Sequence, residues 1–212
     1  MHCPAAISAS RWRHRPKWSY RCPAAWVGSI ARREVMPANL ATRLHSVVKQ
    51  LELTPHILRA LVDTLTEAEA AWKPAPRRFS IAEVMAHLCD AETQAFRARL
   101  QRMIDEDRPA LAYYDQEAIA AAGDYAAVNA REGLQRFHER RTDNLVYLRG
   151  LPADAETRIG EHPELGPITV GELLNEWAFH DLGHIRQIAE LLRAYRYYPH
   201  LGAFRRYYSV AP

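Results

Sequence analysis

The chain lacks the features of a secreted or membrane-spanning protein. It has only three cysteines in 212 residues, an odd number that does not form a disulfide framework, so we expect a reducing compartment. No stretch approaches the ~20 apolar residues that cross a bilayer. No uninterrupted apolar run of the ~7–15 residues typical of a secretory signal lies near the N-terminus. These absences predict a cytoplasmic protein that makes no membrane contact.

The sequence also has no segment with the alternation of apolar and polar residues that marks a half-buried strand. Its apolar fraction is 48% and its charged fraction is 25%, which is the balance of an ordinary globular protein. A chain of 212 residues with this composition can bury a substantial core. We therefore expect an all-α fold.

Basic residues are concentrated at the N-terminus. Residues 1–35 contain seven Lys or Arg residues and one acidic residue, Glu34, so this arm carries +6 and residues 36–212 carry −3 of the net charge of +3. The arm is a disordered tail, a basic aromatic segment that contacts nucleic acid or membrane, or an artefact of start-site choice with translation beginning at Met36. We favour a dispensable, disordered arm over 1–37 and expect no nucleic-acid partner, because charge runs are usually only solvated.

Helical spacing of apolar residues covers most of the remaining chain. It predicts long helices over about 39–65, 80–105, 127–149 and 169–194, the first kinked or restarted at Pro55. Ser80 with Glu83, and Thr169 with Glu172, have the spacing of capping boxes that begin the second and fourth helices. Between the helices we expect a loop over 66–79, a short helix within 109–125 and a small ordered loop over 150–168.

Four long helices joined by connectors of this length predict an antiparallel four-helix bundle over residues 38–195. The tail over 196–212 is aromatic and basic. We expect it to pack back on the bundle through its rings.

Two histidines stand in the core stripe of the last helix. The stripe runs through Leu173, Trp177, His180, His184, Ile188 and Leu191, at helical spacing. His180 and His184 lie one turn apart, and His87 lies at a similar depth in the second helix. Three buried neutral imidazoles are costly without partners, whereas a divalent metal takes one nitrogen from each. We hypothesise that these three residues bind a divalent metal ion.

The surrounding residues leave several possibilities open. Asp90, Glu92 and Asp181 are candidates to hydrogen-bond the outer nitrogens of the histidines. Asp181 stands where the HExxH motif of metalloproteases has glutamate, so peptide hydrolysis is not expected. Cys89 is interpreted as a core residue. The alternative is that the histidines are ordinary core residues with satisfied nitrogens.

Several motifs together resemble the DinB/YfiT-like superfamily. They are Trp72–Pro74, Phe79–Glu92, Ile168–Glu172 and His180–His184, and the resemblance covers about residues 38–195. It implies an up-down-down-up four-helix bundle, often a homodimer, with His87, His180 and His184 as ligands of zinc or nickel. Members of the superfamily include transferases and isomerases that use a low-molecular-weight thiol as cosubstrate. The family name gives no reason to expect DNA polymerase activity.

The motifs and the resemblance leave three hypotheses about function. The first is a metal-dependent small-molecule transferase, of the thiol-dependent S-transferase or isomerase type, or a hydrolase, with an open three-histidine site. The second is a non-enzymatic, stress-associated metal-binding bundle, with a metal site closed by a fourth protein ligand or with no cleft. The third is a nucleic-acid-associated protein that uses the arm. No residue can be assigned as a catalytic acid or base.

Overall fold

The structure, a computed structural model, describes residues 40–210, and it describes side chains from residue 44 onward. The arm predicted over 1–37, with its alternative as a start-site artefact, lies outside the described residues. The last two residues of the predicted tail, 211–212, also lie outside them.

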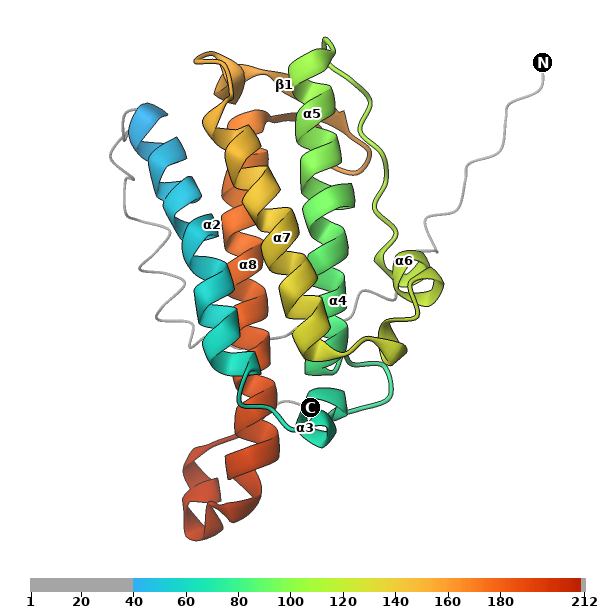
Figure 1. Ribbon diagram of the computed structural model, residues 1–212, viewed down its shortest axis with the longest axis vertical. Coiled ribbons are helices and arrows are strands. Elements are labelled where there is room, and N and C mark those ends of the chain that lie inside the picture. The colour runs from blue at the N-terminus through green and yellow to red at the C-terminus, as the bar shows by residue number, and fades with distance from the viewer. Residues whose placement is uncertain (1–39, 211–212) are drawn as a thin grey trace, which may run out of the picture. The chain divides into compact units, whose positions relative to one another are not determined.

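Four long helical rods form a bundle (Figure 1). They are α2 (Leu40–Val62), the rod from α4 (Ile81–Asp90) to α5 (Ala98–Asp105), α7 (Ala130–Arg149) and α8 (Val170–Leu192). α2 packs against α7 and α8, and α4 packs against the same two helices. α2 and α8 run one way, whereas the α4–α5 rod and α7 run the other way, as the up-down-down-up order requires. The predicted four-helix bundle is confirmed. None of the described helices is long and apolar enough to cross a membrane.

The second rod differs from the uninterrupted α-helix that we predicted over 80–105. The predicted capping box is present, since the Ser80 hydroxyl accepts from the Glu83 amide and the Glu83 carboxylate accepts from the Ser80 amide. Between α4 and α5, however, lies a π-helical segment, η1 (Ala91–Arg97). π-Helical turns inside helices are rare and often mark functional sites. Here the segment begins four residues after His87.

α2 is continuous through Pro55, so the restart predicted there was wrong. Thr54 does not cap a new helix, because its hydroxyl donates to the carbonyl of Gln50 within the same helix. Proline has no amide hydrogen and leaves the carbonyl four residues earlier without its helical donor. That carbonyl belongs to Leu51, and it accepts a hydrogen bond of 2.8 Å from Arg141 Nη1.

Two connectors contain structure that the sequence pattern missed. The predicted loop over 66–79 contains the short helix α3 (Glu67–Ala71), which a capping box between Thr66 and Glu69 begins. The connector over 150–168 contains an antiparallel hairpin of β1 (Ile159–His162) and β2 (Gly166–Thr169). The short helix expected within 109–125 is α6 (Gln116–Ala122).

The tail continues from α8 through the short segments η4 (Arg193–Tyr197), η5 (Tyr198–His200) and η6 (Gly202–Tyr207). At its start the Tyr195 ring meets Trp72 edge-on at 5.5 Å, and the Arg196 guanidinium pairs with Glu69. The packing predicted for the rest of the tail stays a prediction, and the Tyr198 ring is half-buried. Four other rings of the tail are exposed: Tyr197, Phe204, Tyr207 and Tyr208.

Two apolar clusters fill the bundle at different heights. One contains Leu58, Met85, Phe137 and Ile188, and the other contains Leu51, Phe96, Leu148 and Trp177. Each of the four helices also carries polar residues that are largely buried near the level where the clusters meet. They include Thr54 on α2, His87 on α4, Arg141 and Asn144 on α7, and His180 and Asp181 on α8. The core therefore has a polar layer across its middle.

Candidate metal centre

The three predicted histidines meet in this polar layer. His87 comes from α4, and His180 and His184 come from successive turns of α8. The Nε2 atom of His180 lies 3.1 Å from Nε2 of His87 and 3.1 Å from Nε2 of His184. Each residue offers one nitrogen, and the three nitrogens lie within 4.8 Å of one another. Two nitrogens bound at ~2.0–2.1 Å to one ion are about 3 Å apart, so the spacing fits a common metal ligand set.

Burial keeps the three imidazoles neutral. It lowers the pKa of His87 to about 3, with a further contribution from His184. It also lowers the pKa of His180 well below the ordinary value, and it lowers that of His184 against the opposing hydrogen bond to Gln187. A neutral imidazole presents a lone pair, which is the form that binds metal.

The hydrogen bonds of the outer nitrogens test whether a cation fits the cluster. His184 Nδ1 lies 2.8 Å from the amide oxygen of Gln187, which only accepts, so this nitrogen carries the hydrogen and Nε2 carries a lone pair. His180 Nδ1 is buried and has no hydrogen-bond partner among the described residues. If His180 carries its hydrogen on Nε2, that one hydrogen can bond to only one of the two neighbouring histidine nitrogens. A cation among the three nitrogens satisfies all of them.

Aromatic rings enclose one side of the cluster, and the other side is more open. Phe96 stacks on Trp177 with centroids 4.8 Å apart and meets the His180 ring edge-on at 5.2 Å. His87 is 3% exposed, whereas His180 and His184 are half-buried. Beside them, an ideal Cβ built on Gly183 meets no atom within 4 Å. The space beside Gly183 is therefore not filled by other side chains.

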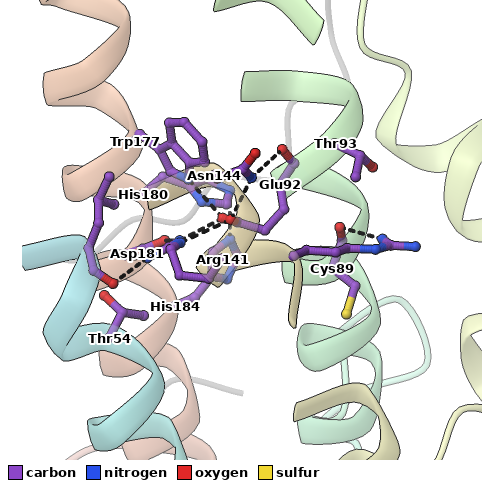
Figure 2. A network of polar contacts seen from close by, with 12 residues as sticks. Thr54, Cys89, Glu92, Thr93, Arg141, Asn144, Trp177, His180, Asp181 and His184 are labelled. Carbon is purple, nitrogen blue, oxygen red and sulfur yellow. Dashed lines mark hydrogen bonds and ion pairs between the residues drawn. The ribbon is translucent and has the colours of Figure 1, made fainter. Parts of the chain in front are cut away.

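A buried network centred on Arg141 lies next to the histidines (Figure 2). The guanidinium donates to both oxygens of Glu92 at 2.9 and 2.6 Å and to both oxygens of Asp181 at 2.7 and 3.1 Å. Glu92 also accepts from Trp177 Nε1 at 2.8 Å and from Asn144 Nδ2 at 3.0 Å. The network joins η1, α7 and α8, which are the elements around the cluster.

The charges in this network determine what its carboxylates can do. Burial alone would lower the pKa of Arg141, but Asp181 and Glu92 outweigh burial and raise it, so the guanidinium stays charged. The prediction that Asp181 and Glu92 hydrogen-bond the histidines was wrong, because both carboxylates are held by Arg141. Asp90 accepts from the Tyr125 hydroxyl and pairs with Arg140. Cys89 is buried as predicted, and burial raises the pKa of its thiol to about 11.

The sequence analysis missed several residues near the cluster. Arg141 and Asn144 had a usable signal, because they interrupt the apolar stripe of α7 that runs through Leu134, Phe137 and Leu148. This is the same signal that identified His180 in α8. Gln187 and Tyr114, which contact the outer nitrogens of the histidines, had no comparable signal.

Comparison with known proteins agrees with this geometry. A family model described as the DinB superfamily matches residues 50–188, which is more than half of the chain. A protein of Oceanobacillus iheyensis named "Putative metal-dependent hydrolase" is 28% identical over 148 residues, covering 69% of this chain and 84% of the relative.

A solved structure, that of YfiT from Bacillus subtilis, has a similar fold. It covers 74% of this chain and 90% of its own, with a TM-score of 0.68 and 23% identity. That protein is described as a probable metal-dependent hydrolase with an unusual four-helix bundle topology. At this identity the likeness establishes the fold.

Proposed function

Since the chain belongs to the DinB superfamily, we propose that it is a metal-dependent hydrolase of small molecules whose ion is bound by His87, His180 and His184. The observation that carries the proposal is the convergence of three neutral imidazoles on one point through their Nε2 atoms. The name of the relative from Oceanobacillus iheyensis, a putative metal-dependent hydrolase, supports hydrolysis as the reaction.

The donor set favours a catalytic ion over a structural one. Catalytic zinc sites have three protein ligands and keep a position open, whereas structural sites have four. Among the described residues, no fourth His, Cys, Asp or Glu joins the cluster. This argues against the form of the non-enzymatic alternative in which a fourth protein ligand closes the site. Imidazole donors suit zinc and nickel, which are the ions we expect.

When bound, a divalent ion would supply a Lewis acid that lowers the pKa of a water or thiol at the open position. The residues of the chain prepare the site for this chemistry. Gln187 holds His184 with its Nε2 lone pair toward the other histidines. Phe96 and Trp177 exclude water on one side, so the substrate enters on the side of Gly183.

A thiol-dependent transferase is the second candidate, and one observation favours it. Glu92 and Asp181, the carboxylates of the buried network beside the histidines, are both held by Arg141. Neither is free to take a proton from a weakly acidic nucleophile. A thiol ionises far more readily than water and needs less help from a base, and its thiolate suits zinc.

The experiment compares the purified full chain with His87→Ala, His180→Ala and His184→Ala, using His56→Ala as the control because His56 is exposed on α2. Emission spectroscopy measures bound zinc and nickel. We expect near-stoichiometric metal in the parent and control and loss of metal in the three variants. A well-folded parent that takes up neither metal would refute the proposal.

Activity assays on the same proteins distinguish the two reactions. Hydrolysis of p-nitrophenyl esters and phosphoesters, lost with chelator and restored by zinc, supports the hydrolase. Conjugation of 2-mercaptoethanol to chlorodinitrobenzene with the same metal dependence supports the transferase. The homodimer and the cytoplasmic location stay predictions, and light scattering on the purified chain tests the first.

A further inference from the structure

We propose that Tyr114, Tyr125 and Asp90 form a hydrogen-bonded relay that sets the tautomer and orientation of His87. The relay makes them positioning residues of the metal centre, so the inference rests on the proposed function. Two of the three come from the long segment between α5 and α7, to which the metal hypothesis assigns no role.

The contacts run from one residue to the next. The Tyr114 hydroxyl lies 3.5 Å from Nδ1 of His87, and the two rings have centroids 6.2 Å apart. The Tyr125 hydroxyl lies 2.9 Å from Oδ2 of Asp90. Between these two contacts the proposed relay has a hydrogen bond from Tyr114 to Tyr125, and the pKa of each hydroxyl is shifted by the other. Asp90 ends α4 three residues after His87, so the relay begins and ends on one helix.

The direction of the hydrogen bonds follows from the acceptor at the end. Asp90 pairs with Arg140, whose Nη1 lies 3.4 Å from Oδ1, and an ionised carboxylate only accepts. Tyr125 donates to Asp90, which leaves its oxygen as an acceptor for the hydrogen of Tyr114. In the proposed relay Tyr114 donates to Tyr125, and its own oxygen accepts from Nδ1 of His87.

This direction has a consequence for the metal centre. An acceptor beside Nδ1 places the hydrogen of His87 on Nδ1 and leaves the Nε2 lone pair facing His180, 3.1 Å away. Gln187 imposes the same tautomer on His184. In two of the three imidazoles, a neutral acceptor thus holds the hydrogen on Nδ1 and leaves the Nε2 lone pair available to bind metal. Partners of this kind typically change metal affinity ~10–100-fold when they are removed.

The hydroxyls of the relay stay protonated at neutral pH. Burial raises the pKa of Tyr114 to about 12, and burial together with Asp90 raises the pKa of Tyr125 further. The relay therefore acts by orientation and keeps its hydrogen-bond direction across the physiological range.

The test uses Tyr114→Phe and Tyr125→Phe, which remove only the hydroxyls, with Tyr113→Phe as the matched control because Tyr113 is adjacent to Tyr114 and 62% exposed. Two-dimensional nitrogen–hydrogen spectra of the metal-free proteins read the tautomer of His87 directly. We expect Nδ1–H in the parent and the control, and a mixture of tautomers in Tyr114→Phe. A role limited to packing would leave the tautomer unchanged.

Zinc affinity, measured by competition with a chromophoric chelator, gives the second readout. We expect affinity to fall ~10–100-fold in Tyr114→Phe, by a smaller factor in Tyr125→Phe, and not in Tyr113→Phe. The amide of Asp90→Asn can also donate, so the zinc affinity of this variant should lie between those of the parent and Tyr114→Phe. Asp90→Asn replaces Tyr125→Phe if that variant fails to fold.

The two readouts separate this inference from the proposed function. If the parent binds no zinc, the proposed function fails. The tautomer of His87 in the metal-free protein still shows whether the relay sets it. An Nε2–H tautomer in the parent, or the same tautomer and affinity in Tyr114→Phe as in Tyr113→Phe, would overturn the relay.

Discussion

Replacing Arg141 with methionine should strongly destabilise the protein. The side chain is fully buried and its guanidinium makes five hydrogen bonds, two to Glu92, two to Asp181 and one to the carbonyl of Leu51. Methionine keeps much of the apolar stem but removes the positive charge that pairs with both carboxylates and the donor of the Leu51 carbonyl. Glu92 would keep only its bonds from Trp177 and Asn144. The Leu51 carbonyl has no helical donor, because Pro55 lacks the amide.

The magnitude follows from these losses. Removing one partner of a buried ion pair typically costs about 3–5 kcal/mol, and an unsatisfied buried carbonyl adds about 1–3 kcal/mol. We expect the free energy of unfolding to fall by about 5 kcal/mol, a large part of the ~5–15 kcal/mol that stabilises a typical domain. Urea unfolding followed by circular dichroism measures the change.

Two comparisons show whether the reasoning is correct. Arg149→Met, on the same helix as Arg141, removes an exposed ion pair with Glu52 of α2 and should change stability by less than about 1 kcal/mol. Adding Glu92→Gln and Asp181→Asn to Arg141→Met removes the stranded charges and should recover part of the loss. A loss below about 1 kcal/mol in Arg141→Met, or no recovery in the triple variant, would refute the account of the polar layer.

Three further predictions concern stability. Without metal, the free energy of unfolding should decrease as the pH falls from 6.5 to 5, because burial lowers the pKa of His87, His180 and His184, so the unfolded chain takes up protons that the native state does not. The limit is about 4 kcal/mol per pH unit for the three together, and His87→Gln should reduce the slope in urea titrations at several pH values. Gly183→Ala should raise the melting temperature by stabilising the interior of α8 by up to about 1 kcal/mol, since the new Cβ meets no atom. Gly160→Ala should lower the melting temperature, because its Cβ would lie 2.9 Å from Met103 Cγ.

Contrary results for the pH dependence and for Gly183→Ala are equally clear. Stability that does not change between pH 6.5 and 5 in the metal-free protein would mean that the histidines are accessible to protons in the native state. A lower melting temperature in Gly183→Ala would mean that the space beside His184 is filled.

The bundle and the three histidines could be predicted because both depend on local periodicity. Capping boxes at Ser80 and Thr169 mark two helix starts, and each is present in the structure. His180 and His184 stand in an apolar stripe, and such a stripe must face the core. A helix face is a property of neighbouring residues, so a single sequence reveals it.

The remaining features depend on contacts between segments that are far apart in the chain. In the π-helical turn over 91–97, the backbone carbonyl of Glu92 accepts a hydrogen bond from Asn144 Nδ2, which comes from another helix. Tyr114 reaches His87 from 27 residues away, in a segment without periodicity. The strands of the hairpin have only four residues each, which is too short for alternation to be recognised. Arg141 is the exception, because its place in an apolar stripe was visible.

X-ray absorption at the zinc edge of the zinc-loaded full chain tests the central claim most directly. The account predicts one zinc per chain with three imidazole nitrogens at ~2.0–2.1 Å and one further light ligand. His184→Ala should lose one imidazole contribution or fail to retain zinc. Zinc with sulfur ligands, zinc with fewer than two imidazoles, or a folded chain that retains no zinc would contradict it.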